Sequence, residues 1–176
     1  MRMKTIALLA VILAAFATLG FSCINEGFLV SINLEGISGV YTINAGDGKF
    51  NECSNPVSPN TYLGTTYADA DIRDARIYDI KVSTIGTYTG NVNGSVTVNG
   101  VTILTFNGAF SYFNTPRSLL TDPNITRSSS GISALVTAIK NRQMITLCGI
   151  GGVSPSPFPS GQKVKIEVLG QIDAEP

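Results

Sequence analysis

Apolar and polar residues alternate along much of this chain. In residues 163–172 the apolar positions are Val164, Ile166, Val168 and Ile172, separated by lysine, glutamate and glutamine. Residues 28–35 show the same pattern, with Phe28, Val30, Ile32 and Leu34 on one side. A period of two residues is the pattern of a β-strand that buries one face.

Shorter segments of the same kind predict further strands at residues 40–43, 76–85, 88–98, 101–106, 109–113 and 143–148. In residues 76–85 we expect Tyr78, Ile80 and Val82 on the inner face. Asn99-Gly100 predicts a type I′ hairpin turn, because both central residues of that turn need positive φ. Residues 36–39 predict another turn, and the Gly-, Asn- and Pro-rich residues 44–66 predict a long loop.

Residues 128–141 have a different period. Ser128 and the two serines after it offer hydroxyl groups that can cap a helix. The apolar residues that follow recur at helical spacing, at Ile132, Leu135, Val136 and Ile139. We expect one short amphipathic helix that closes an open end of the β-structure; an apolar stripe turned toward a partner or a membrane is the alternative.

These elements predict a single all-β domain over residues 23–176. The expected architecture is an antiparallel β-sandwich or partly open β-barrel of about seven to nine strands with one short α-helix. The proline-rich residues 154–160 predict a rigid loop, because proline cannot donate a hydrogen bond to a neighbouring strand.

The first 22 residues have the layout of an export signal. Arg2 and Lys4 precede an apolar run over residues 5–19, and Gly20-Phe21-Ser22 stand directly before Cys23. A cysteine at this place resembles the lipobox of bacterial lipoproteins. The resemblance implies removal of residues 1–22, a lipid on Cys23 and attachment to a membrane. In some bacteria an aspartate after the cysteine retains such proteins in the inner membrane; Ile24 stands there, which favours the outer membrane.

Two other interpretations of this segment stay open. The lipobox usually has leucine three positions before the cysteine, where this chain has Gly20. An ordinary signal peptidase could cut at the same bond, since Gly20 and Ser22 are small. The apolar run could also remain as an uncleaved anchor, although it is at the lower limit of a membrane span.

Cleavage before Cys23 would change the charge and the cysteine content of the mature chain. Without Arg2 and Lys4, ten basic residues stand against twelve acidic ones, so we expect no nucleic-acid partner. Cys53 and Cys148 remain, and in an exported chain they predict a disulfide. Two buried free thiols are the alternative. No C-x-x-C is present, so redox catalysis has no support.

The chain contains no histidine, which excludes Ser-His-Asp and Cys-His catalysis and every metal site that uses histidine. Asp69, Asp71 and Asp74 could offer oxygen ligands to Ca²⁺, with solvated loop charges as the alternative. Asn44, Asp47, Asn51 and Glu52 form a second polar segment, which turn chemistry explains first. Glu35, Asp79 and Glu167 are available for a two-carboxylate hydrolase.

Three functions follow, in order of preference. The first is a non-catalytic lipoprotein of the cell envelope, which binds an envelope protein or copies of itself close to the outer membrane. The second is an exported Ca²⁺- or glycan-binding domain. The absence of tryptophan weakens glycan binding, and Tyr62, Tyr67, Tyr88 and Tyr112 would have to replace it. A carboxylate hydrolase is the third. We expect no enzyme activity and no cofactor.

Overall fold

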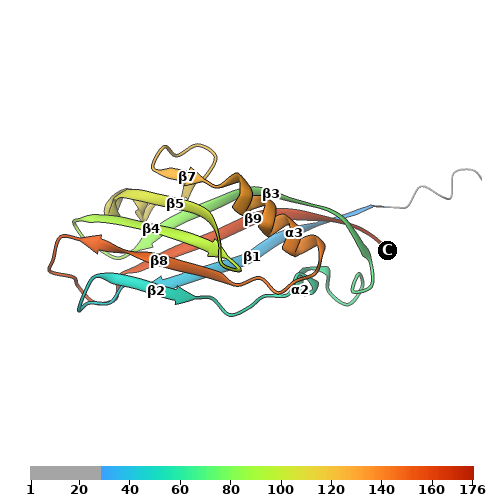
Figure 1. Cartoon of the computed structure of the whole chain (residues 1–176), viewed down its shortest axis with the longest axis horizontal. Helices are drawn as coiled ribbons and strands as arrows, with labels where there is room; N and C mark the ends of the chain where they lie inside the picture. The colour runs from blue at the N-terminus through green and yellow to red at the C-terminus, as the bar shows by residue number, and fades with distance from the viewer. Residues whose placement is uncertain (1–28) are drawn as a thin grey trace, which may run out of the picture.

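The computed structural model describes residues 29–176, which form two antiparallel sheets packed face to face (Figure 1). Sheet A has the order β1-β9-β3-β6, with β1 at Val30–Thr42, β9 at Lys163–Glu175, β3 at Asp71–Ile85 and β6 at Arg117–Ser118. Sheet B has the order β2-β8-β4-β5-β7, with β2 at Lys49–Cys53, β8 at Leu147–Ser154, β4 at Asn91–Val98, β5 at Val101–Ala109 and β7 at Ile125–Arg127. The helical segments are α2 (Asn60–Leu63), the 3₁₀ helix η1 (Phe110–Asn114) and α3 (Ser129–Lys140).

The predicted all-β domain is confirmed, as a sandwich and not as a barrel. When the short strand β7 is set aside, each sheet has four strands, and chain neighbours such as β1 and β2 lie in opposite sheets. This order arises when one long antiparallel ladder is rolled up, and it defines a jelly roll.

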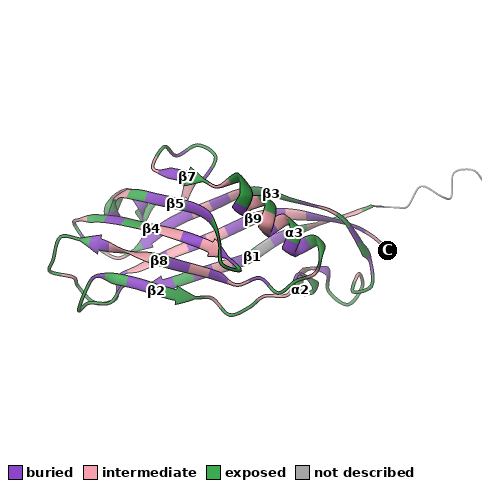
Figure 2. Cartoon of the chain, in the orientation of Figure 1, coloured by how far each residue is buried: buried purple, intermediate pink, exposed green. Residues whose placement is uncertain are grey.

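The core lies between the sheets, where strands of both alternate between buried and exposed residues (Figure 2). The alternation expected for residues 163–172 is confirmed, because Val164, Ile166, Val168 and Ile172 are each at most 1% exposed in β9. Strand β9 pairs with β1 on one side and with β3 on the other, along nearly its whole length. The last strand is therefore central to sheet A.

The predicted turn at residues 36–39 is wrong, because β1 is one strand that crosses this region with a bulge. The register to β9 shifts between Glu35 and Ile37, and Gly36 has a φ of 111°. Glycine adopts this conformation without steric cost, so the strand absorbs one extra residue and continues. The expected start of this strand at Phe28 lies outside the described residues.

The expected inner position of Tyr78 is wrong, because β3 has a bulge at this residue. The register of β3 to β9 shifts between Ile77 and Asp79, which leaves Tyr78 as the extra residue on the outer side, 47% exposed. Ile80 and Val82 are fully buried, as expected. A one-residue slip moves the following side chains to the other face of a sheet, and sequence alternation alone does not reveal where it occurs.

Other boundaries also differ from the predictions. The expected loop at 44–66 contains β2 and α2, and the strand expected at 143–148 begins only at Leu147. Residues 109–113 form mainly the helix η1 and not a strand, because Phe110 and Phe113, three positions apart, both bury their rings in the core. The Asn99-Gly100 turn is confirmed, with φ of 48° and 84°.

The aromatic side chains between the sheets fit against glycine. Tyr41 stacks with Phe50 at 6.3 Å between ring centroids, and it lies over Gly149, whose missing β-carbon would come within 2.6 Å of the Tyr41 ring. The Tyr41 hydroxyl is buried and has no hydrogen-bond partner in the described structure. Burial raises the pKa of Tyr41 to about 12.

Helix α3 covers the part of sheet A that sheet B does not reach. Strands β1, β3 and β9 are 13 to 15 residues long, whereas those of sheet B have at most nine, and α3 packs against β3 and β5 at the end of the shorter sheet (Figure 1). Ser128 caps the helix as expected, since its hydroxyl accepts a hydrogen bond from the Gly131 amide at 3.2 Å. No helix within residues 29–176 is long and apolar enough to cross a membrane.

Arg142 fixes the connection before β3 to the end of α3. Its guanidinium donates hydrogen bonds to the Asn60 side chain and to the backbone carbonyls of Ala68 and Ala70. These contacts bind residues 60–70 to the helix and complete the cover over sheet A.

Gly131→Ala should destabilise the protein although alanine favours helix formation by about 1 kcal/mol. A β-carbon at this position would lie 2.6 Å from the Cα atom of Ile103 and still closer to the Thr102 carbonyl oxygen. We expect a loss of roughly 1–3 kcal/mol, measured by urea unfolding. Ser130→Ala, at an exposed position of the same helix, is the matched control, and an equal or higher stability of Gly131→Ala would contradict the close packing.

Tyr41→Phe should stabilise the protein at neutral pH, because it removes a buried hydroxyl that has no partner. In the unfolded chain Tyr41 ionises near pH 10, whereas in the folded chain it does so near pH 12. The wild-type protein should therefore lose stability as the pH rises from 10 to 12, and Tyr41→Phe should lose less. Urea unfolding at pH 9 and pH 11 measures both effects; parallel losses in the two proteins would show that Tyr41 does not contribute.

Candidate functional site

The predicted Ca²⁺ ligands do not come together as a loop. Asp69 lies before β3, but Asp71 and Asp74 belong to the strand itself. A carboxylate oxygen of Asp71 is 3.1 Å from Arg73, and one of Asp74 is 3.1 Å from Arg76. The Arg76 hydrogen bond lowers the pKa of Asp74. No group of three acidic or cysteine residues within 29–176 is arranged to hold a metal ion.

The polar segment at the β1–β2 turn uses its oxygens locally. Asn44 accepts a hydrogen bond from the Gly46 amide at 2.7 Å, and Asp47 accepts one from the Lys49 amide at 3.1 Å. Glu52 accepts one from the Thr42 amide at 3.0 Å. These bonds are the turn chemistry that the sequence suggested first.

Two of the acidic residues considered for hydrolysis, Asp79 and Glu167, lie on the outer face of sheet A. Asp79 accepts hydrogen bonds from the Ile80 amide and the Ser118 hydroxyl, at 2.8 and 2.9 Å. Glu167 forms an ion pair with Lys165 at 2.7 Å. In the strand register Glu35 and Asp79 both lie opposite Leu169, on either side of β9. They are thus two strand spacings apart, roughly 10 Å.

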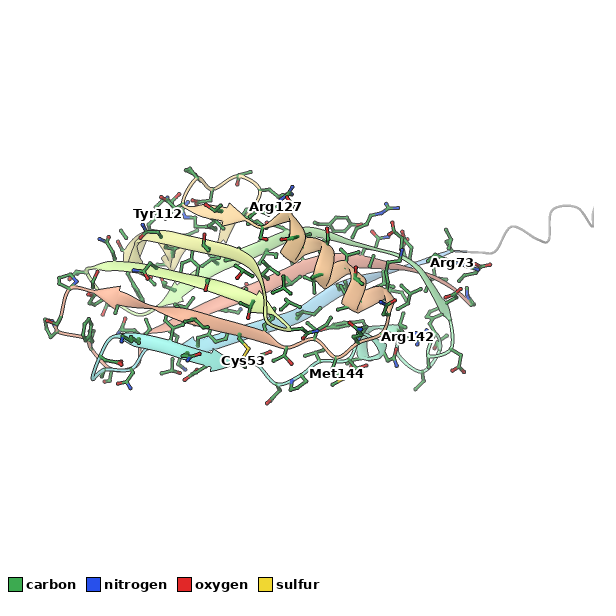
Figure 3. All side chains as sticks on the ribbon, viewed as in Figure 1. Cys53, Arg73, Tyr112, Arg127, Arg142 and Met144 are labelled. Carbon is green, nitrogen blue, oxygen red and sulfur yellow. A yellow bond between two sulfur atoms is a disulfide. The ribbon has the colours of Figure 1, made fainter. Side chains whose placement is uncertain are left out.

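A polar network covers the same face where the two ends of the described chain meet. Asp173 accepts hydrogen bonds from Ser31 at 2.7 Å and Gln171 at 2.9 Å, and Arg76 lies 3.4 Å from it. Arg73, at the tapered end of the molecule in Figure 3, pairs with Glu175 at 2.5 Å. These charges are already paired with one another and leave no evident ligand site.

The outer face of sheet B carries a groove. A hollow of about 660 Å³ lies over β4, β5 and β7, and a second of about 370 Å³ lies over β2, β4 and β8. Asn93, Ile150 and Gly151 line both hollows, so the two lie side by side. The groove therefore runs across the strands, from Pro123 and Thr126 at one end to Lys49 and Asn51 at the other.

Two register rows form the floor of this groove. One row crosses all five strands through Asn51, Ile150, Ser95, Thr105 and Thr126. The other crosses four strands through Lys49, Gly152, Asn93 and Asn107. Lys49 is the single charged residue in the two rows, and Asp47 lies near it in the same hollow. The rows consist mainly of neutral amides and hydroxyls, with the half-exposed Ile150 in the middle.

The sequence does not reveal this groove. In the sequence, each residue of the groove has the pattern of an ordinary exposed position in a strand. Only the pairing of five strands places these residues in rows. The tyrosines proposed for sugar binding are elsewhere. Tyr88 is buried, Tyr112 donates a hydrogen bond to Asp122 at 2.6 Å, and Tyr62 and Tyr67 pack against the core.

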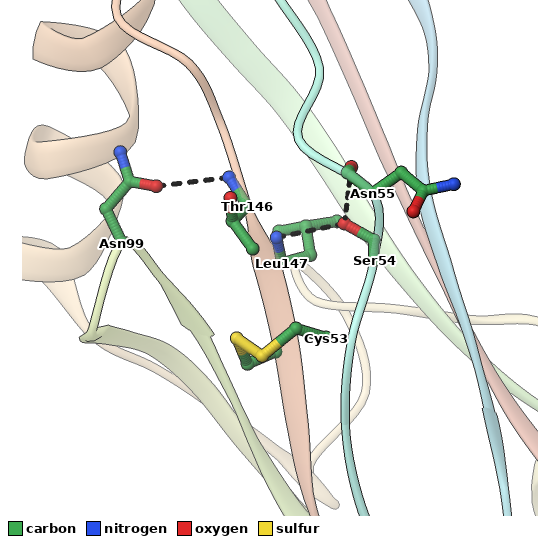
Figure 4. The surroundings of a disulfide bond; sticks show 7 residues. Cys53, Ser54, Asn55, Asn99, Thr146 and Leu147 are labelled. Carbon is green, nitrogen blue, oxygen red and sulfur yellow. Dashed lines mark hydrogen bonds between the residues drawn. A yellow bond between two sulfur atoms is a disulfide. The ribbon is translucent and has the colours of Figure 1, made fainter.

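The predicted disulfide between Cys53 and Cys148 is present, and it fastens the edge strand at one end of the groove (Figure 4). The two cysteines are directly opposite in the β2–β8 register. Beyond the bridge the Ser54 amide donates to the Leu147 carbonyl at 2.7 Å, and the Ser54 hydroxyl accepts from the Leu147 amide at 3.1 Å. Strand β2, which supplies Lys49 and Asn51, is thereby held to β8.

A further hollow of about 340 Å³ lies at the end of the sandwich opposite Leu29 and Pro176, the two ends of the described chain. It is lined by residues 87–89 and 155–159, and its rim contains three prolines. The Tyr88 hydroxyl donates a hydrogen bond to the Pro155 carbonyl, which joins the two loops.

Comparisons with known proteins give no family for this chain. No protein-family description matches it, and no curated protein does. Among solved structures it is similar to a chain of Desmodium yellow mottle tymovirus, with a TM-score of 0.34 and 13% sequence identity over 86% of this chain and 84% of that one. A similarity at this level carries no argument about function.

Loss of the disulfide should destabilise the protein without abolishing the fold. The cysteines are 95 residues apart, and on the chain-entropy model a bridge of this length contributes about 4–5 kcal/mol. We expect the Cys53→Ser/Cys148→Ser variant to melt roughly 10 °C lower. Wild-type protein isolated from its native cells without reductant should show no free thiol at these positions when denatured, and two titratable thiols there would contradict the bridge.

Proposed function

We propose that this protein is a non-catalytic lipoprotein of the bacterial cell envelope, which binds a partner while it is attached to a membrane through Cys23. The N-terminal sequence motivates the attachment, since a basic start, an apolar run and Gly20-Phe21-Ser22 precede the cysteine. The outer membrane is the proposed location, because Ile24 follows the cysteine.

The position of the chain ends carries the proposal. Val30 at the start of β1 pairs with Ala174 near the end of β9, so the described chain begins and ends at one pole of the sandwich (Figure 1). Cys23 is six residues before Leu29, and an extended chain spans at most about 3.6 Å per residue. A lipid on Cys23 would therefore hold this pole within roughly 22 Å of the bilayer surface.

Such an attachment leaves the binding surfaces accessible. The hollow between residues 87–89 and 155–159 lies at the opposite pole, and the groove of sheet B lies along the side of the sandwich. The domain would stand on its narrow end and present both surfaces to the surrounding compartment. An envelope protein or a second copy of this chain is the partner expected from the sequence.

Cys23→Ser should move the protein from the membrane fraction to the periplasm or the medium. Wild type should fractionate with membranes and incorporate labelled palmitate, because the thioether lipid can form only on the cysteine. Ser22→Ala, which keeps a small residue beside the cleavage site, is the control and should behave as wild type. Wild-type protein that is soluble and unlabelled would show that the chain is secreted without a lipid.

A further inference from the structure

We infer that the groove on the outer face of sheet B binds a neutral polysaccharide chain. This inference goes beyond the protein partner proposed above, and it does not depend on lipid attachment at Cys23. It rests on the shape of the groove, the chemistry of its floor and the near absence of charge.

The shape suits an extended polymer. The floor crosses five strands, which are about 4.8 Å apart, so the groove is roughly 20 Å long. Its two hollows, of about 660 and 370 Å³, are adjacent and share Asn93 and Ile150 in their lining. A single small molecule would fill only part of this space, whereas a chain of several sugar units can follow the rows from β2 to β7.

The floor offers free hydrogen-bonding groups at regular intervals. The side chains of Asn93, Ser95, Thr105, Asn107 and Thr126 make no hydrogen bond to another residue within 29–176. Amides and hydroxyls can both donate and accept, as sugar hydroxyls do. Strand pairing fixes the backbone beneath them, so the spacing of these residues along the rows is set before a ligand arrives.

The apolar residues complete the match to a sugar. Ile150 lies in the middle of the floor and is 48% exposed, and Pro123 lines the end next to β7. A pyranose ring has C–H faces as well as hydroxyl edges, so it can cover these side chains while its hydroxyls bond to the neighbouring rows. No aromatic ring is exposed in the groove, which points to many weak contacts along a polymer and not to tight binding of one sugar.

Charge distinguishes this ligand from others. A nucleic acid or another phosphate polymer needs several cationic side chains, and the groove has Lys49 alone, close to Asp47. A stable protein interface needs a well-packed apolar centre with aromatic or arginine anchors, and the groove offers only Ile150 and Pro123. A neutral, hydroxyl-rich chain is the occupant that this floor complements.

Affinity electrophoresis tests the inference. The wild-type chain, purified in detergent, is run through gels that contain a neutral polysaccharide (β-glucan, mannan or xylan) or an acidic one (alginate). We expect at least one neutral polysaccharide to retard migration, and alginate to have no effect. Failure of all three neutral polymers, or equal retardation by alginate, would overturn the inference.

Variants locate the site. Asn93→Ala/Asn107→Ala removes two amides from one row and should weaken retardation at least tenfold, while its melting temperature stays near that of wild type because both positions are exposed. Asn33→Ala, an exposed asparagine of β1 on sheet A, is the matched control and should bind as wild type. Unchanged binding by the double variant would overturn the assignment to this groove.

The same variants separate this inference from self-association. If size-exclusion chromatography shows a wild-type dimer that the double variant loses, the groove is an interface between copies and the polysaccharide assignment is wrong. Membrane fractionation of wild type and Cys23→Ser tests the lipid attachment independently of polysaccharide binding. Failure of lipid attachment leaves the groove result intact, and failure of polysaccharide binding leaves the membrane result intact.

Discussion

The pairing of β9 between β1 and β3 is the constraint on which the rest of the structure depends. The last strand of the chain is the second of sheet A, and Val30–Thr42 and Asp71–Ile85 have no common partner without it. These contacts join the first and the last strand of the described chain, so the sandwich cannot close until β9 is present. The same pairing places Val30 beside Ala174 at one pole, which is the pole that the proposed lipid on Cys23 would hold near a membrane.

Close packing between the two sheets depends on glycines, which leave space for large side chains and for helix α3. The ring of Tyr41 occupies the space over Gly149, and α3 lies on β5 because Gly131 has no side chain. Burial of these rings and of the apolar face of α3 stabilises the sandwich, and the cost is a Tyr41 hydroxyl that has no partner. The Cys53–Cys148 bridge performs a comparable task at the edge, where β2 has only β8 as a neighbour in its sheet.

The two outer faces of the sandwich differ in chemistry. Sheet A carries several charged residues that pair with one another, as with Arg76 between Asp74 and Asp173. Sheet B carries amides and hydroxyls that remain free, arranged in rows by the strand register. Paired charges need no ligand, whereas free neutral groups along a groove can be satisfied by one. Sheet B is therefore the stronger candidate for a binding surface. The acidic residues singled out from the sequence lie mainly on sheet A and do not form the strongest candidate site.

The sequence by itself determined the all-β class, the Asn99-Gly100 turn, the α3 helix with its Ser128 cap, the buried face of β9 and the pairing of Cys53 with Cys148. Each of these follows from local periodicity, from turn chemistry or from simple counting. Only the tertiary structure decided the bulges at Gly36 and Tyr78, the helical form of η1 and the existence of the groove. A bulge depends on the register to a strand far away in the sequence, and η1 depends on a core that draws Phe110 and Phe113 to one side. The rows of the groove bring together residues of five strands from Lys49 to Gly152, and no local pattern records which strands will be neighbours.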